Sequence, residues 1–265
     1  MIAISDGTLL LEVYELGAYV STLKHHDVEV ILRGEPASPM RAGMAFMAPF
    51  ANRVRGGVYE FDGVRYWLPR NAEGHAIHGL VHDKEFEVID LLDDRVTLST
   101  RLSHEGYPSE LSIKVTYGVN GALRASTLIT NVGDRRAPLV VGWHPNFVVK
   151  GRWRVRPYGV AMRCESEGKI PTGRLSPHEF DVDGDYDDCF FIESGHVELT
   201  SETGAILIES NNMKYFQVYT GVKGAVALEP MSGAPDAFHN GMGLSILCPG
   251  ESREFSFSLL FRPQP

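Results

Sequence analysis

The sequence has few cysteines, no excess of positive charge and no long apolar run. Only three of its 265 residues are cysteine, and they lie far apart, so they show neither a disulfide framework nor a zinc spacing. Acidic residues outnumber basic ones by 34 to 25, which gives a net charge of −9. With no cluster of Lys and Arg, this balance argues against nucleic acid and membrane surfaces as partners. No segment approaches the roughly 18 apolar residues of a membrane span.

The N-terminal residues also lack the pattern of a secretory leader. Residues 1–6 contain no basic segment followed by an apolar one, so we expect no signal peptide. The low cysteine content fits a reducing compartment, and together these features predict a cytoplasmic location. The chain is 43% apolar and 22% charged, which is typical of a globular protein and excludes disorder as its main state.

Sustained helical periodicity is hard to find, whereas short runs alternate apolar and polar residues. The clearest run covers residues 111–117, and residues 254–259 repeat the pattern. Alternation with a period of two predicts strands with one buried face. Asp62-Gly63 and Asn120-Gly121 lie between such runs and tolerate the positive φ that a two-residue hairpin turn needs. We therefore predict an all-β protein with at least a dozen strands, folded as a sandwich or a closed barrel.

Four short segments place polar, ionisable residues at the ends of apolar runs. They are residues 51–53, 75–79, 142–145 and 226–230. In the third, His144 follows an apolar run, and in the fourth Glu229 does the same. A carboxylate at the end of a buried strand costs free energy unless it is paired or used. Because proline follows each residue, we expect both side chains at a sheet edge or a strand exit, where a cleft can form.

Each of these residues also has a purely structural interpretation. His144 could be a hydrogen-bonded core histidine, and Glu229 could simply terminate a strand before proline. Arg53 could be a surface cation. Asp187-Asp188 could form a solvated acidic turn or a calcium site. Spacing alone does not choose between these interpretations and a catalytic one.

Eight segments, in the same order along the chain, make this sequence similar to the aldose 1-epimerase (galactose mutarotase) family. They are Asn52-Arg53 with the hairpin at 59–63, His78-Gly79, Gly106-Tyr107-Pro108, residues 143–147, residues 187–190, residues 217–221, Glu229-Pro230 and Pro249-Gly250-Glu251. Each segment alone is weak evidence, but the ordered set extends from about residue 40 to 262. The resemblance implies a large twisted antiparallel β-sandwich, the galactose mutarotase-like supersandwich, as a single domain over residues 1–265. It also implies no cofactor and no required metal.

The resemblance further implies a reaction, the interconversion of α and β anomers of a free aldose. Ring opening removes the proton on O1 and delivers one to the ring oxygen, which needs a general base and a general acid. By resemblance Glu229 is the base and His144 is the acid, and His78 adds a hydrogen bond near the ring oxygen. We expect an imidazolium and a carboxylate that stabilise each other. We also expect the two groups to face each other across a hollow about as wide as one pyranose.

Further residues are implied as anchors for the sugar, a small-molecule monosaccharide. Arg53 and Asp187 resemble the family's hydroxyl-binding residues, with Gln217 and Asn52 as additional candidates. The neighbouring Asp188 is the alternative to Asp187. Two tryptophans, Trp143 and Trp67, could offer an apolar face to the sugar or belong to the core.

The chain departs from the family pattern in ways that leave the sugar open. Asn146 stands where the family often has an aromatic residue, and the bulky tryptophan common after His78-Gly79 is missing. Beyond Arg41, Arg53 and Arg55, no basic cluster accompanies the motifs, which disfavours the alternative of a hexose-phosphate mutarotase.

Two competing functions belong to different classes of protein. The first is a catalytically silent sugar-binding or sensor protein, although binding alone does not need an acid–base pair. The second is a glycoside hydrolase or lyase that uses Glu229 and Asp187 as two carboxylates, which would leave His144 idle. The sequence is compatible with either a monomer or a homodimer.

Overall fold

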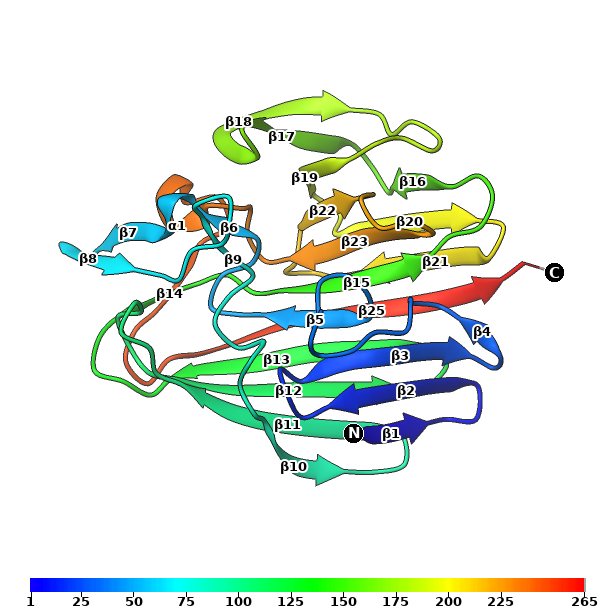
Figure 1. The fold of residues 1–265 in the computed structure, drawn as a ribbon, viewed down its shortest axis with the longest axis horizontal. Coiled ribbons are helices and arrows are strands. Elements are labelled where there is room, and N and C mark those ends of the chain that lie inside the picture. The colour runs from blue at the N-terminus through cyan, green and yellow to red at the C-terminus, as the bar shows by residue number, and fades with distance from the viewer. Residues whose placement is uncertain (265) are drawn as a thin grey trace.

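Two large β-sheets hold most of the strand residues in the computed structural model, which describes residues 1–264 (Figure 1). The first sheet has eleven strands. Its order is β1 (Ile2–Ser5), β2 (Leu9–Tyr14), β3 (Tyr19–His25), β5 (Met44–Met47), β15 (Gly142–Val148), β23 (Ala225–Met231), β22 (Tyr215–Tyr219), β19 (Asp187–Ile192), β17 (Ala161–Glu167) and β18 (Ile170–His178), with β4 (Val28–Glu29) paired to β3.

The second large sheet has eight strands. Its order is β10 (Glu87–Leu91), β11 (Arg95–Leu102), β12 (Leu111–Val119), β13 (Leu123–Asn131), β25 (Ser252–Pro263), β21 (Gly204–Glu209), β20 (His196–Ser201) and β16 (Arg154–Pro157). Three small sheets pair β14 (Ala137–Leu139) with β24 (Ser245–Leu247), β6 (Arg53–Val54) with β9 (Ala76–Ile77), and β7 (Val58–Phe61) with β8 (Val64–Trp67). The helical elements are the 3₁₀ turn η1 (Arg55–Gly57) and the one-turn helix α1 (Ala237–Asn240), which lies beside β7 at one end of the molecule (Figure 1).

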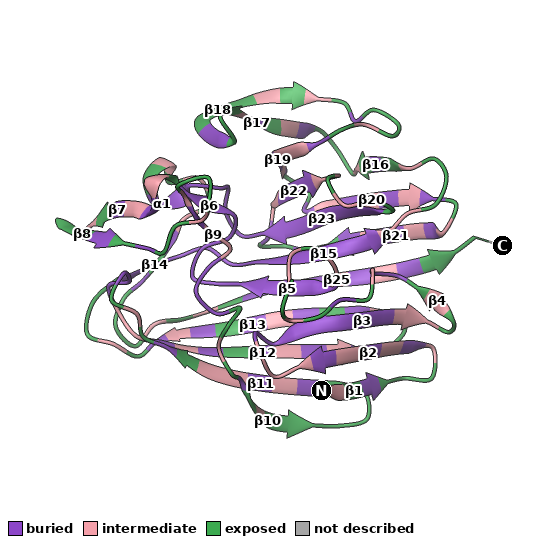
Figure 2. Cartoon of the chain, in the orientation of Figure 1, coloured by how far each residue is buried: buried purple, intermediate pink, exposed green. Residues whose placement is uncertain are grey.

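The alternating runs form the strands that their pattern predicts. Along β12 every second residue from Leu111 to Val119 is buried, and Phe255, Phe257 and Leu259 on β25 are buried in the same way. Strands in the middle of the eleven-stranded sheet, such as β15 and β23, are buried on both faces and therefore show no alternation (Figure 2). The all-β class and the antiparallel sandwich are confirmed.

The two predicted hairpin turns differ in length. Asp62 and Gly63 both have positive φ and join Phe61 directly to Val64, so this turn has the two residues expected. Between β12 and β13 the register instead pairs Val119 with Leu123, which leaves a three-residue loop. Only Gly121 has positive φ there, so the glycine takes the left-handed position while Asn120 does not.

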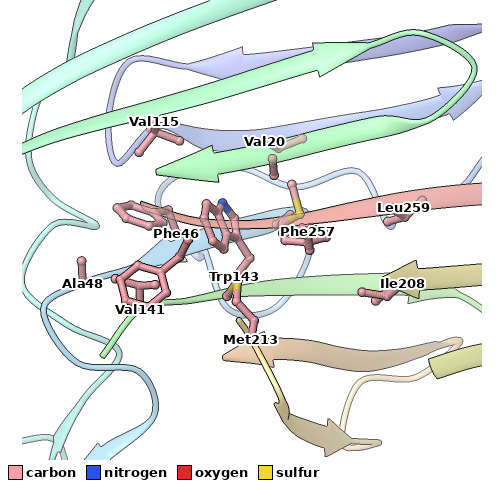
Figure 3. Packing of buried hydrophobic residues seen from close by; sticks show 14 of the residues in the cluster. Val20, Phe46, Ala48, Val115, Val141, Trp143, Ile208, Met213, Phe257 and Leu259 are labelled. Atoms are coloured by element: carbon pink, nitrogen blue, oxygen red, sulfur yellow. The ribbon is translucent and has the colours of Figure 1, made fainter. Parts of the chain in front are cut away.

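Trp143 belongs to the core between the two sheets rather than to a sugar-binding face. Its side chain is fully buried, with its ring centroid 5.0 Å from Phe46 and 5.3 Å from Phe257 on the opposite sheet (Figure 3). The indole Nε1–H donates a hydrogen bond to the hydroxyl of Tyr117 at 3.1 Å. Because successive side chains on a strand point to opposite faces, this packing directs His144 away from the core.

Three further observations bear on the sequence expectations. Cys164, Cys189 and Cys248 are all free thiols. Within residues 1–264, no helix has the length and apolar character needed to cross a membrane. The single domain over residues 1–265 stays a prediction, and Pro265 lies outside the described residues.

Candidate active site

Adjacent strands of the eleven-stranded sheet align the candidate catalytic residues in one row. Gln217 on β22 is the cross-strand partner of Glu229 on β23 and of Cys189 on β19. The register pairs on either side of His144, on β15, align it with Glu229. Directly opposite residues in antiparallel strands point to the same face, so this row lies together on the outer face of the sheet.

His144 and Glu229 both lie within strands in the middle of the sheet, so their expected position at a sheet edge or strand exit is wrong. The prolines that follow them do not end the strands, because Pro145 pairs with Met44 and Pro230 with Phe216.

The outer face forms the floor of a pocket of about 330 Å³. All seven residues proposed from the sequence line it, namely Asn52, Arg53, His78, His144, Asp187, Gln217 and Glu229. Loops add most of the remaining lining residues, which are Met40, Arg41, Asn71, Ala72, Glu73, Ile77, Lys169 and Tyr219. The strands thus supply the acid–base candidates, and the loops supply most of the rim.

His144 and Glu229 are in direct contact at the floor of the pocket. The Nε2 atom of His144 lies 3.3 Å from Oε1 of Glu229, and the two side chains are only 4% and 1% exposed. The expectation that a pyranose would separate them is wrong. Cross-strand partners have Cβ atoms only about 4.5–5.5 Å apart, so the two side chains meet without a gap between them.

Burial favours the neutral forms of this pair, whereas the sequence predicted an imidazolium and a carboxylate. Loss of solvent lowers the pKa of His144 and raises the pKa of Glu229, which favours an imidazole and a carboxylic acid. The Asp187 charge raises the pKa of both groups, and Arg53 lowers that of Glu229. The neutral pair and the ion pair hold the same number of protons, so transfer of one proton across the contact interconverts them.

Two buried acceptor atoms in the pocket have no hydrogen-bond partner within residues 1–264. They are Oε2 of Glu229 and Oε1 of Gln217. A buried acceptor without a partner costs free energy, and native proteins keep few of them. Both residues line the pocket, so a bound molecule rich in hydroxyl groups would supply the missing donors.

The choice between the two neighbouring aspartates is resolved by their partners. Asp187 lines the pocket, where its Oδ1 accepts a hydrogen bond from Nε2 of Gln217 at 2.9 Å and its Oδ2 lies 2.7 Å from Nζ of Lys169. Asp188 does not line this pocket and forms an ion pair with Arg163 at 2.7 Å. Successive strand residues point to opposite faces, which separates the two carboxylates.

Arg53 is a buried member of the pocket wall, so its interpretation as a surface cation is wrong. Its Nη1 donates to Oδ1 of Asn52 at 3.2 Å, while its Nε and Nη2 contact Oε2 of Glu73 at 3.0 and 2.9 Å. Lys169 lies 3.6 Å from the other oxygen of Glu73. A continuous chain of polar contacts therefore runs from Asn52 through Lys169 to Asp187 along one side of the pocket.

His78 reaches the pocket through an unusual backbone conformation. Its φ is +61°, and that of Gly79 is +83°. A Cβ on Gly79 would lie 2.3 Å from the carbonyl oxygen of Ala48, so only glycine fits there. The His78 ring packs edge-on against His144 at 5.5 Å. Burial, with smaller contributions from the charges of His144 and Arg53, holds the pKa of His78 well below its usual value, so this ring is neutral.

Glu73, Lys169 and Tyr219 line the pocket but were not predicted from the sequence. Glu73 lies in an irregular loop, and Lys169 lies in the turn between β17 and β18, where a charged residue is ordinarily a solvated one. Asp236 was not predicted from the sequence either, yet it is buried and accepts hydrogen bonds from the Arg55 amide at 2.8 Å and Nδ1 of His239 at 2.6 Å. It thereby ties the segment that follows Arg53 to α1.

Other candidate features do not form a comparable site. Among residues 1–264 no group of three or more His, Cys, Asp or Glu side chains is arranged to hold a metal ion, which gives no support to a calcium site. Trp67 on β8 is 60% exposed and does not line the pocket. A larger hollow of about 520 Å³ adjoins β16, β17 and β18, but its lining contains no contact between an imidazole and a carboxylate.

Solved structures with the same fold cover nearly the whole chain. A putative aldose 1-epimerase from Escherichia coli K12 superposes with a TM-score of 0.82 at 22% identity, over 99% of this chain and 98% of that one. A GalM/aldose epimerase homologue from Caenorhabditis elegans gives a TM-score of 0.86 at 18% identity, over 100% and 99% of the two chains. At these identities the likeness establishes the fold alone.

Sequence relatives carry the comparison further. The uncharacterized protein YphB of Escherichia coli is 27% identical over 97% of both chains, and human galactose mutarotase is 30% identical over 50% of this chain and 42% of its own length. A family model described as aldose 1-epimerase matches residues 1–260, a range that includes every lining residue of the pocket. This match shows that the chain belongs to the aldose 1-epimerase family.

Proposed function

We propose that the protein is a mutarotase, an isomerase that interconverts the α and β anomers of a free monosaccharide. The observation that carries this proposal is the 3.3 Å contact between His144 and Glu229 at the floor of a pocket, with Oε2 of Glu229 unpaired. The pocket volume of about 330 Å³ lies at the small end of the range for ligand sites, which suits one sugar ring.

The contact between the two groups fits the chemistry of a hemiacetal. O1 and the ring oxygen are bonded to the same carbon, C1, so an acid and a base that lie side by side can serve both atoms. Glu229 takes the proton from O1 while His144 gives one to the ring oxygen, and the C1–O5 bond breaks as the C1 carbonyl forms. Rotation about C1–C2 followed by the reverse proton transfers closes the ring as the other anomer and restores both residues.

The starting charge state can arise inside the pocket. Burial favours the neutral pair, whereas catalysis requires an imidazolium and a carboxylate. One proton moved from Glu229 to His144 gives this ion pair without exchange with solvent. Hydroxyl groups of the sugar that donate to Oε2 of Glu229 favour the carboxylate, because hydrogen bonds to the charged form lower the pKa of an acid.

The direct test is anomer exchange measured by two-dimensional exchange NMR on a panel of neutral pentoses and hexoses, a uronic acid and a hexose 6-phosphate. We expect acceleration for at least one neutral aldose. A protein that binds a sugar tightly in calorimetry but leaves every exchange rate at the buffer value would contradict the proposal and favour the silent sugar-binding alternative.

Asp187 and Asp188 provide a matched pair of variants for the sugar anchor. We expect Asp187→Asn to lower kcat/KM by about 10- to 100-fold, chiefly through KM, because a charged hydrogen bond contributes about 1.5–3 kcal/mol. Asp188→Asn removes the same charge one residue away, outside the pocket, and is expected to leave both constants nearly unchanged. Steady-state exchange kinetics decide the point, and equal losses in the two variants would contradict the assignment.

The pH dependence of kcat follows from the directions of the pKa shifts. Activity is lost at low pH when the pair gains a second proton, and at high pH when it loses its only one. Burial opposes both the net positive and the net negative pair. We therefore expect an acidic limb below 6.5, the ordinary pKa of histidine, and a broad plateau above it. A narrow optimum with its acidic limb above 6.5 would show that the buried pair does not control the rate.

The alternative functions receive less support from the contacts in the pocket. A hydrolase would need Asp187 as a second free carboxylate, but both of its oxygens are engaged, by Gln217 and Lys169. A phosphate group would need unpaired cations, yet two of the three Lys and Arg residues that line the pocket, Arg53 and Lys169, are already paired with carboxylates. Among residues 1–264 only Arg41 at the rim is left for such a group. The cytoplasmic location and the single domain remain predictions that accompany the mutarotase proposal.

A further inference from the structure

Lys169 lies in the turn of the β17–β18 hairpin, and its side chain reaches the pocket. Its ammonium group lies 2.7 Å from Oδ2 of Asp187 and 3.6 Å from Oε1 of Glu73. The other carboxylate oxygen of Glu73 contacts Arg53. A lysine from a turn therefore connects Asp187 and Arg53, the two residues proposed to anchor the sugar.

The sheet does not hold the outer part of this hairpin. Among residues 1–264, β17 pairs with β19 through residues 161–163 alone. A register shift between Cys164 and Ser166 then interrupts the pairing of β17 with β18. In Figure 1 the hairpin lies at the top edge of the molecule, beyond β19. The contacts that the turn makes with other elements therefore help to place it over the pocket.

The backbone of the turn makes lysine a costly residue at this position. Gly168 and Lys169 have φ values of +55° and +68° and join Glu167 to Ile170 as a two-residue turn. A left-handed conformation suits glycine and is strained for a residue with a side chain. The hydrogen bond with Asp187 raises the pKa of Lys169 and keeps it charged. A charged side chain in a strained turn, in contact with two carboxylates of the pocket, indicates a role there.

We propose that Lys169 is a positioning residue that holds the two sugar anchors, Asp187 and Arg53, in place for binding. It acts on Asp187 directly and on Arg53 through Glu73. This inference rests on the proposed mutarotase function for its kinetic consequence alone. Nε2 of Gln217 already holds Oδ1 of Asp187 at 2.9 Å, so Lys169 at Oδ2 fixes the orientation of this carboxylate.

The balance of charge gives the physical reason. Arg53 and Lys169 carry two positive charges, which match the two negative charges of Glu73 and Asp187. Without Lys169, two carboxylates share one cation, and their repulsion displaces both from the positions that the sugar needs. Lys169 and Glu73 are 46% and 45% exposed, so solvent weakens their contact. We therefore expect a smaller loss than from removal of an anchor itself.

The kinetic test compares Lys169→Met, Lys169→Arg and Glu73→Gln with Arg174→Met in steady-state anomer exchange. Arg174 lies on the same hairpin and pairs with Glu165 at 2.7 Å, outside the pocket, so it is the matched control. We expect Lys169→Met and Glu73→Gln to raise KM by about 2- to 10-fold with little change in kcat. Lys169→Arg keeps the cation and should restore most of the affinity, and Arg174→Met should leave KM unchanged.

Salt provides a readout that a merely structural role would not change. The screening length falls from about 30 Å at 0.01 M to about 3 Å at 1 M salt. Because salt weakens the contacts of Lys169 in the wild type, the ratio of KM between Lys169→Met and the wild type should fall toward one. The ratio between Arg174→Met and the wild type should stay at one throughout.

NMR of the protein without sugar tests the link independently of catalysis. We expect Lys169→Met to shift the side-chain amide resonances of Gln217 and the Nε–H resonance of Arg53, neither of which it contacts directly, whereas Arg174→Met leaves them in place. Unchanged resonances or an unchanged KM in Lys169→Met, or an equal rise of KM in Arg174→Met, overturns the proposal. If the wild type accelerates no aldose, the mutarotase proposal fails while these resonances still decide the role of Lys169.

Discussion

Replacement of Glu229 by glutamine is expected to lower kcat for anomer exchange by about 10²- to 10⁴-fold, the contribution of one positioned acid or base. Glutamine keeps the shape of the side chain but cannot accept the proton of O1. We expect KM to change little, because the sugar anchors on Asp187 and Gln217 remain. Exchange NMR at saturating sugar measures the loss, and Glu254→Gln, on an exposed part of the opposite sheet, is the control.

The same variant separates catalysis from stability. Burial raises the pKa of Glu229 above 4.5, so the folded state loses stability as pH rises from 4.5 through the folded pKa. Glutamine carries no charge, and the variant should therefore be at least as stable as the wild type at neutral pH. Chemical denaturation checks this. An unfolded variant would contradict the stability prediction, and a stable, fully active one would contradict a role as catalytic base.

His144→Gln is expected to produce a loss of similar size, about 10²- to 10⁴-fold in kcat, because the ring oxygen then departs without a proton donor. The more informative measurement uses the double variant. Residues that act as one unit give non-additive losses, so His144→Gln with Glu229→Gln should be scarcely slower than either single variant. Multiplication of the two losses would instead indicate two groups that act in separate steps.

The strands of this protein could be predicted where one face of the sheet is exposed, because apolar and polar residues then alternate and the apolar ones mark the buried face. Residues 111–117 illustrate this, whereas β15 and β23 are buried on both faces and carry no periodic signal. Six of the eight ordered motifs supply a residue that lines the pocket, and the exceptions are Gly106-Tyr107-Pro108 and Pro249-Gly250-Glu251. The roles of those residues remain predictions.

The geometry of the pair could not be predicted from motifs that lie about 85 positions apart in the chain. Contact between His144 and Glu229 depends on the pairing of β15 with β23, and their neutral forms depend on how deeply both are buried. The place of Glu73 and Lys169 in the pocket could not be predicted, because charged residues in loops ordinarily face solvent. Their partners, Arg53 and Asp187, come from distant parts of the chain.

His144, Glu229 and Gln217 lie on paired strands, which tolerate insertions and deletions less well than the loops around the pocket do. Insertion or deletion of one residue within β15, β22 or β23 would turn every later side chain of that strand to the opposite face and dismantle the reacting groups. The segments 40–41, 71–73 and 168–169 lie outside these strands and can vary in length and charge. Divergence among descendants of this fold should therefore alter the choice of sugar while the proton-transfer step is retained.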